Sequence, residues 1–217
     1  MTNLMLPGFG DDAPLPPPSM ADLRQQALGC TRCRLHATRQ QVVWGQGDPH
    51  SPLMMVGQGP SVTDDRTGDI YSGPAGEELD AVLAEAGLQR AQIYLTNIHK
   101  CVARQKADPY NIRPPTKTEL QACRPWLDGE LGLVKPRVLV CVGGPAAQGL
   151  LGADFDLSAQ RGEWVQGPGG VRALATFQPT YITRLRQHDP ARADLAYRQL
   201  VGDLQKAAVA AGLAAAP

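Results

Sequence analysis

Four short, largely apolar runs divide the chain, and segments with helical periodicity lie between them. The apolar runs are Leu53–Val56, Ile93–Thr96, Arg137–Val142 and Arg172–Phe177. Apolar runs without alternation are typical of strands that are buried on both faces of a parallel sheet. Their alternation with helices predicts an α/β fold with a central, mainly parallel, four-stranded sheet.

Helix signals flank these runs. Thr116 and Glu119 match a capping box, and Gly87 ends a segment with apolar residues at helical spacing. The predicted helices are 20–28, Ala75–Ala86, one from Thr116 to Leu133, a short one ending at Leu151 and a long one opened by Pro190.

The composition limits the classes of protein to which the chain can belong. Its 217 residues suffice for one α/β domain, placed at 19–217 after a proline-rich, disordered arm at 1–18. The formal net charge of +0 excludes a global basic field for nucleic acid, although local basic clusters remain. No apolar run reaches the roughly 18 residues that span a bilayer, and no signal peptide is visible. We therefore expect a cytoplasmic protein without membrane contact.

Three loops that follow predicted strands carry polar residues. Gly57-Gln58-Gly59-Pro60 follows the first strand, Asn97 and Lys100-Cys101 follow the second, and Gln178-Pro179-Thr180 follows the fourth. Ligands of such sheets bind beyond the carboxyl ends of the strands, so the three loops are expected to converge on one cleft. The first loop lacks the glycine and lysine pattern of a phosphate cradle, and the two aspartates that follow it would repel an anion.

Five cysteines in a cytosolic protein indicate a metal site, a redox role or burial. Cys30 and Cys33 form a C-x-x-C pair that follows a helix and no strand, which disfavours a thioredoxin-like site. Cys101 and Cys123 could complete a four-thiolate site, whereas Cys141 lies inside an apolar strand, where a buried thiol is the default. Four thiolates suit zinc or an iron–sulfur cluster, and their spacing does not choose between them.

A series of short motifs extends over nearly the whole chain after the arm. They are Cys30-x-x-Cys33, Gly57-x-Gly59-Pro60, Asp65-Arg66-Thr67-Gly68, Gly73-Pro74-Ala75-Gly76, Tyr94-Leu95-Thr96-Asn97, Lys100-Cys101, Cys123-Arg124-Pro125-Trp126-Leu127, Arg161-Gly162-Glu163-Trp164 and Thr176-Phe177-Gln178-Pro179. In this order they resemble family 4 of the uracil-DNA glycosylase superfamily, which contains an iron–sulfur cluster. The resemblance implies a three-layer α/β/α fold, uracil-containing DNA as the partner, and a [4Fe–4S] cluster held by Cys30, Cys33, Cys101 and Cys123.

In that family the first loop holds a uracil that has been flipped out of the duplex, because catalytic groups cannot reach a stacked base. The resemblance implies that Gly57 and Gly59 contact the substrate, that Tyr71 stacks on the base and that Asn97 reads its edge. A side-chain amide offers a donor and an acceptor, so it can pair with uracil and penalise cytosine. The alternatives are an ordinary half-buried aromatic at Tyr71 and a turn role for Asn97.

The chain departs from the family pattern at two positions that matter for chemistry. Gln58 stands where the family has glutamate, and Gln178 stands where it has histidine. Cleavage of the glycosidic bond leaves positive charge on the sugar and negative charge on uracil, so losing a carboxylate and a strong donor would slow it. Asp64 or Asp65 could supply the missing charge, or both could cap the turn and face solvent.

Further residues of the resemblance concern DNA. Arg184-Leu185-Arg186 follows the loop where the family inserts an apolar wedge between cations, with a solvated turn as the alternative. The segment Val102–Pro115 is longer than its counterpart in the family and could alter contact with DNA. We expect a monomeric glycosylase of base-excision repair, slowed by the two glutamines. The alternative is an inactive or weakened member that binds DNA or damage.

Overall fold

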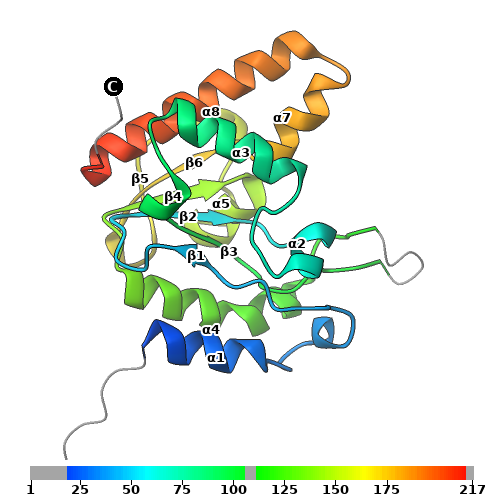
Figure 1. The fold of residues 1–217 in the computed structure, drawn as a ribbon. Coiled ribbons are helices and arrows are strands. Elements are labelled where there is room, and N and C mark those ends of the chain that lie inside the picture. Colours follow the sequence, from blue (N-terminus) through cyan, green and yellow to red (C-terminus); the bar gives the residue numbers. More distant parts are fainter. Residues whose placement is uncertain (1–18, 106–110, 214–217) are drawn as a thin grey trace, which may run out of the picture.

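A computed structural model describes residues 19–105 and 111–213, and a six-stranded sheet forms its centre (Figure 1). The strand order is β1-β3-β2-β4-β6-β5, and the four inner strands are parallel. They are β2 (Leu53–Gly57), β3 (Tyr94–Asn97), β4 (Val138–Val142) and β6 (Arg172–Thr176), which confirms the four apolar runs. The arm expected at 1–18 lies outside the described residues.

The expected number of four strands was wrong, because the sheet has an additional strand at each edge. These are β1 (Gln46–Gly47) and β5 (Val165–Gln166), and both pair antiparallel with their neighbours. Each has only two residues and is incompletely buried, so no apolar run or alternation marks it in the sequence.

Helices cover both faces of the sheet, which confirms the α/β class and gives three layers (Figure 1). One face carries α3 (Pro74–Glu85), α7 (Pro179–Arg186) and α8 (Pro190–Ala211). The other carries α4 (Lys117–Val134) and α5 (Gly144–Leu151), with α1 (Met20–Leu28) packed against α4. The shorter described helices are α2 (Val62–Thr67), α6 (Leu157–Gln160) and the 3-10 turns Arg34–Ala37, Arg90–Gln92 and Pro168–Gly170.

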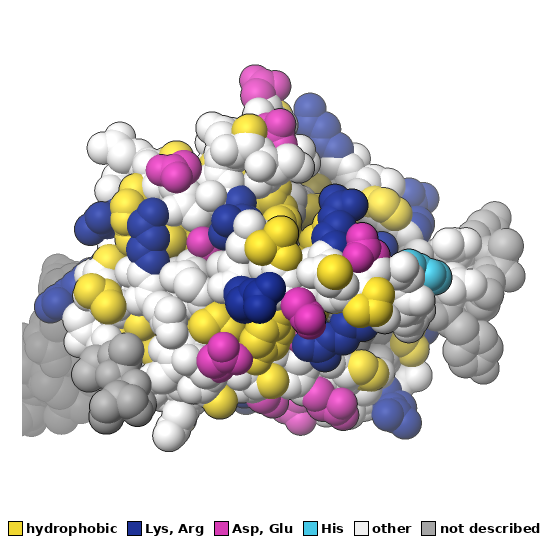
Figure 2. All heavy atoms as spheres, turned by 90° about the horizontal axis from the view of Figure 1, so that it is seen from above, with side chains coloured by type: hydrophobic (Ala, Val, Ile, Leu, Met, Phe, Trp, Pro, Cys, Tyr) yellow, Lys and Arg dark blue, Asp and Glu magenta, His cyan; other side chains and the backbone are white. Residues whose placement is uncertain are grey.

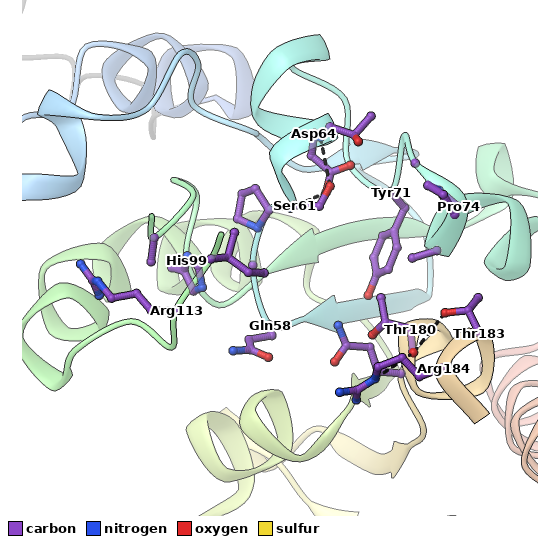
Figure 3. A pocket seen from close by; sticks show the side chains of 18 residues that line it. Gln58, Ser61, Asp64, Tyr71, Pro74, His99, Arg113, Thr180, Thr183 and Arg184 are labelled. Atoms are coloured by element: carbon purple, nitrogen blue, oxygen red, sulfur yellow. Dashed lines mark hydrogen bonds between the residues drawn. The ribbon is translucent and has the colours of Figure 1, made fainter. Parts of the chain in front are cut away.

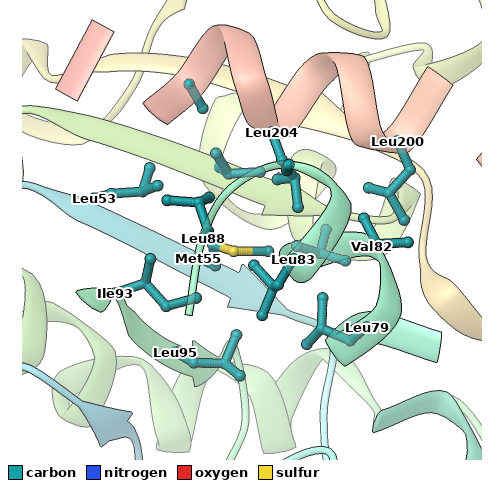
Figure 4. Close-up of a cluster of buried hydrophobic side chains, with 14 of the residues drawn as sticks. Leu53, Met55, Leu79, Val82, Leu83, Leu88, Ile93, Leu95, Leu200 and Leu204 are labelled. Atoms are coloured by element: carbon teal, nitrogen blue, oxygen red, sulfur yellow. The ribbon is translucent and has the colours of Figure 1, made fainter. Parts of the chain in front are cut away.

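Alternate residues of each inner strand supply two separate cores. Leu53 and Met55 of β2 point into the core beneath α3 and α8 (Figure 4), while Met54 and Val56 point into the core beneath α4 and α5. A strand that is buried on both faces needs apolar side chains at every position. This requirement explains why the inner strands appear in the sequence as continuous apolar runs.

The apolar pattern does not predict α2 and α7, which directly follow the loops after β2 and β6. Helix α2 has six residues and depends on a capping box, in which the Ser61 hydroxyl accepts from the Asp64 N–H and the Asp64 carboxylate accepts from the Ser61 N–H. Helix α7 has eight residues and begins with Pro179 at its first position. Both are too short to establish a helical period.

The surface above α3 and α8 mixes Lys and Arg with Asp and Glu side chains (Figure 2), in keeping with the net charge of +0. In the described part of the chain, no helix combines the length and apolar character needed to cross a membrane.

A buried ion pair joins β3 to α4. The Lys100 ammonium, 1% exposed, donates to the Glu130 carboxylate, to the Thr96 hydroxyl and to the Asn97 carbonyl. Glu130 also accepts from the Tyr94 hydroxyl at 2.9 Å. Charges are tolerated at this depth only when they are paired and fully hydrogen-bonded.

We expect Lys100→Met to lower the free energy of unfolding by about 3–5 kcal/mol, because it leaves the Glu130 carboxylate buried without a counter-charge. Lys117→Met, at an exposed position of the same α4, is the matched control and should change it by less than about 0.5 kcal/mol. Denaturant titration measures both values. Equal shifts of the two unfolding midpoints would contradict the expectation.

Candidate active site

A cavity of about 510 Å³ opens at the carboxyl ends of the parallel strands (Figure 3). Its wall includes residues 58–61 after β2, His99 after β3, and Gln178 and Thr180 at the start of α7. The three loops therefore converge on one cleft, as the sequence predicts.

The two glutamines that replace the family's glutamate and histidine both line this cavity. Gln58 is half-buried, and Gln178 precedes α7 with its side chain against Gly143. Neither carboxamide forms a hydrogen bond with another described residue, so both can donate to a ligand. Neither can act as a strong base.

Asp64 also lines the cavity, and it is 5% exposed rather than solvent-facing. Its carboxylate accepts hydrogen bonds from the Ser61 N–H at 2.8 Å and from the N–H and hydroxyl of Ser72 at 2.8 and 2.9 Å. Its negative charge is thus fixed at the cavity wall, and its oxygens are already engaged in shaping the turn.

The structure does not bring Asp65 to the cavity. It is fully buried, forms an ion pair with Arg104 at 2.6 Å, and accepts from the backbone N–H groups of Gln40 and Gln41. The expectation that these aspartates could face solvent was therefore wrong for both. Through these contacts Asp65 connects α2 to Gln40, Gln41 and Arg104.

Tyr71 lines the cavity with its backbone in the left-handed region, at φ 51°. This conformation is unfavourable for a bulky residue and persists only where neighbours enforce it. The Arg90 guanidinium enforces it by donating to the carbonyls of Ile70 and Tyr71, each at 2.9 Å. Gly76 is required beside it, since a Cβ there would lie 1.7 Å from the Tyr71 oxygen. Burial, followed by the charge of Asp64, raises the pKa of the phenol, which stays protonated.

Asn97 ends β3 and is 2% exposed. Its Oδ1 and the Tyr71 hydroxyl both lie against Gly57, where a Cβ would be 2.5 Å from each. The Asn97 carboxamide has no hydrogen-bond partner among the described residues. Gly57 therefore leaves room for two polar groups, and neither has a hydrogen-bond partner among the described residues. Tyr71 lines the cavity, whereas Asn97 is not one of the residues that line it.

The three residues expected to contact DNA lie in the last turn of α7 and in different surroundings. Arg184 is exposed and lines the cavity. Leu185 is half-buried and packs against the core under α7. Arg186 forms an ion pair with Glu78, with two contacts of 2.8 Å. Only Arg184 has its charge directed at the cleft.

Two further cavity residues come from the long segment after Cys101, and the sequence did not single them out. An antiparallel bridge pairs Arg104 with Ile112. Ile112 is 52% exposed at the cavity, and Arg113 lines the cavity beside it. The centre of this segment, 106–110, lies outside the described residues.

His99 is a third cavity residue that sequence reasoning missed. It is 4% exposed, and its Nδ1 lies 2.9 Å from the Cys101 carbonyl oxygen. Burial is the main cause that lowers the pKa of its imidazole to about 4. The sequence does contain an indication of it, because His99 lies two residues after Asn97, in a loop that follows a parallel strand and therefore reaches the cleft.

Cys30, Cys33, Cys101 and Cys123 line a second, smaller cavity together. Three N–H groups point at their sulfurs: Arg39 at Cys101 (3.5 Å), the Lys100 backbone at Cys123 (3.3 Å) and Trp126 at Cys30 (3.3 Å). Such donors suit the thiolate ligands of a metal centre. No group of three His, Cys, Asp or Glu side chains within 19–105 and 111–213 is arranged around a single metal ion. Cys141 is fully buried in β4, as expected of a packing thiol.

Glu119 connects the two cavities. It accepts from Arg113, at 2.8 Å to each oxygen, from Arg34 next to Cys33, and from the Thr116 N–H at the start of α4. These contacts, with Arg113 foremost, lower the pKa of the Glu119 carboxyl to about 2.

Comparison with known proteins gives one family. The family model described as the uracil DNA glycosylase superfamily matches residues 44–202. The type-4 uracil-DNA glycosylase of Thermotoga maritima is 33% identical, over 78% of this chain and 86% of the relative. The type-4 uracil-DNA glycosylase of Archaeoglobus fulgidus is 35% identical, over 76% of this chain and 83% of the relative. A type-5 uracil-DNA glycosylase of Thermus thermophilus is 32% identical, over 74% of this chain and 79% of the relative.

The lowered pKa of Glu119 predicts a loss of stability in acid. Its folded pKa lies below its unfolded value, so the stabilisation is complete above about pH 5 and disappears as the pH falls towards about 2. We expect Glu119→Gln to melt at a lower temperature than the unmodified protein at neutral pH. The difference between the two melting temperatures should become smaller as the pH falls from about 5 towards about 2. A difference in melting temperature that does not change with pH would contradict this assignment.

Proposed function

The chain belongs to the uracil-DNA glycosylase superfamily, and we propose that it hydrolyses the bond between uracil and deoxyribose in DNA. The observation that carries this proposal is the approach of Asn97 and Tyr71 to Gly57: Tyr71 lines the cleft, and the Asn97 amide, which has no hydrogen-bond partner among the described residues, lies behind Gly57 next to the Tyr71 hydroxyl. A planar base that is flipped out of the duplex needs both a stacking surface and a polar reader. The relatives named type-4 uracil-DNA glycosylase support the same substrate.

Asn97 is the proposed reader of the base. Its amide can accept from the N3–H of uracil and donate to O4, whereas cytosine presents the opposite pattern at these positions. In a buried site an unmatched polar group costs about 1–3 kcal/mol, which is enough to reject the wrong base. Tyr71 is the proposed stacking residue, and the clamp by Arg90 keeps its ring in place before the base arrives.

The chemistry must proceed without the usual glutamate and histidine. Gln178 can donate a hydrogen bond to the departing uracil, while Gln58 offers no negative charge to the developing sugar cation. Asp64 is the acidic group that remains at the cavity wall, so we assign it the electrostatic role. We propose that cleavage is slower than in a member with both original residues. Asp65 is neutralised by Arg104 and takes no part.

DNA would approach across the rim of the cavity. Arg184 can contact phosphates, which position a duplex without reading its sequence, whereas Arg113 at the same rim is paired with Glu119. Ile112 is an exposed apolar side chain at the same rim. It suits the space that a flipped base leaves better than Leu185, which already packs against the core.

We propose that Cys30, Cys33, Cys101 and Cys123 hold a [4Fe–4S] cluster. The shared cavity and the three N–H donors support this assignment. The cluster would connect the loop of Cys30 and Cys33 with the segments of Cys101 and Cys123. It would thereby stabilise the loop before Cys101, which contains His99 and Lys100. The cytoplasmic location and the monomeric state stay predictions from the sequence.

The proposed function predicts abasic product in a single-turnover assay with excess protein and a duplex that carries one uracil. A matched duplex with cytosine should give none. Asn97→Ala should lower the uracil rate by about 10- to 100-fold, because a buried hydrogen bond to the base is lost. Specific binding without product would favour the alternative, a DNA-binding protein that has kept the pocket. Equal processing of the two duplexes by both proteins would contradict the role of Asn97.

The cluster proposal predicts a brown protein with about four iron ions per chain. Cys123→Ser should lose iron and colour. Cys141→Ser is the matched control, because Cys141 is also buried but lies in β4 away from the four-cysteine cavity, and it should keep both. Zinc in place of iron, or the same iron content in the two variants, would contradict the proposal.

A further inference from the structure

Arg161 and Gly162 do not line the cavity, yet they contact the strand that leads into it. The Gly162 N–H donates to the Ala175 carbonyl of β6 at 2.9 Å. The backbone of Gly162 is left-handed, at φ 73°, and a Cβ there would lie 2.5 Å from a carboxylate oxygen of Asp203. Glycine is therefore required at position 162, because only it allows α8 to bring Asp203 against this turn.

Asp203 joins Arg161 to the end of β6. Its carboxylate is 6% exposed and accepts from the Arg161 guanidinium and from the Thr176 hydroxyl, each at 2.6 Å. Thr176 is the last residue of β6, and its carbonyl accepts from the Gly143 N–H at 2.8 Å. A buried carboxylate must be paired and hydrogen-bonded, so its partners are held firmly in place. The end of β6 is thus fixed both by α8 and by the loop after β4.

Arg161 also contacts the residue that follows Thr176. Its guanidinium carbon lies 5.4 Å from the centre of the Phe177 ring, within the range of a cation–π interaction. The Phe177 ring packs in turn on Tyr181 of α7, with 5.2 Å between the ring centres. One charged group therefore supports Thr176 through Asp203 and Phe177 directly. These are the two residues that precede Gln178.

Gln178 depends on this support for its direction. It lines the cavity, and its carboxamide has no hydrogen-bond partner among the described residues. Its direction is therefore set by its own backbone and by contact with Gly143, where a Cβ would lie 3.2 Å from Oε1 of Gln178. A displacement of about 1 Å in a group that meets the transition state can lower a rate by about 10²-fold.

We infer that Arg161 is a positioning residue of the proposed glycosylase. Through Asp203 and Phe177 it holds Gln178 in the cavity wall, where the Gln178 amide donates to the departing uracil. This inference rests on the proposed function. It gives a role to the Arg161-Gly162 pair of the sequence, which lies on the far side of β6 from the loop after β2.

A double-mutant cycle between Arg161 and Gln178 tests the inference. We expect Arg161→Met to lower the single-turnover rate on uracil DNA at saturating protein by about 10- to 100-fold, with affinity for the duplex within about twofold. Gln178→Ala should lower the rate by about 10²–10³-fold, because a donor to the leaving group is lost. In Gln178→Ala protein, Arg161→Met should change the rate by less than about twofold, since no amide remains to be positioned.

Two further variants control the cycle. Arg172→Met removes a cation that lies 4.0 Å from the Trp164 ring, at the other end of β6, and should keep the rate within about twofold. Asp203→Asn retains an acceptor for the Thr176 hydroxyl but loses the charge that holds Arg161. It should reproduce the loss caused by Arg161→Met, and it keeps the test decisive if Arg161→Met fails to fold.

Three results would overturn the inference. Losses from Arg161→Met and Gln178→Ala that multiply would show that Arg161 does not act through Gln178. Weaker binding of the duplex with an unchanged rate at saturation would show that Arg161 contacts DNA itself. Unmodified protein that binds uracil DNA but releases no base would overturn the proposed function, and this inference with it.

Discussion

The buried ion pair of Lys100 and Glu130 is the interaction on which the rest of the molecule depends. Lys100 donates through its side chain to the Asn97 carbonyl and through its backbone to Cys123 Sγ at 3.3 Å, while Glu130 belongs to α4. One residue therefore connects the end of β3, the helix on the lower face and the cysteine cavity. Because an unpaired charge at this depth would be very unfavourable, the pair fixes the distance between the helix and the sheet. Asn97 and the cysteines consequently cannot shift independently of each other.

The cleft combines a strained element with unused polar groups. The left-handed backbone of Tyr71 is held by Arg90, so the aromatic wall is fixed before any ligand binds. The carboxamides of Asn97 and Gln58 have no hydrogen-bond partner among the described residues.

The parts that could be predicted from sequence are those with a local or periodic cause. The inner strands appear as apolar runs because both of their faces are buried, and the three loops converge because parallel strands end at one edge. The edge strands, α2 and α7 are too short to show a period. The burial of Asp65 depends on Arg104, 39 residues away, and the engagement of Arg186 depends on Glu78, 108 residues away. The place of His99 at the cavity wall is supported by a hydrogen bond to the Cys101 carbonyl, which no spacing in the sequence reveals.

The contact between Gly59 and His99 also constrains how this protein can evolve. A methyl group at position 59 would overlap the imidazole, since it would lie 2.0 Å from Cε1 and Nε2 of His99. The ring cannot easily retreat, because its Nδ1 is bonded to Cys101. The two positions should therefore covary among relatives. Lineages with histidine at 99 should carry glycine at 59, and alanine should enter at 59 only where the histidine has first been replaced.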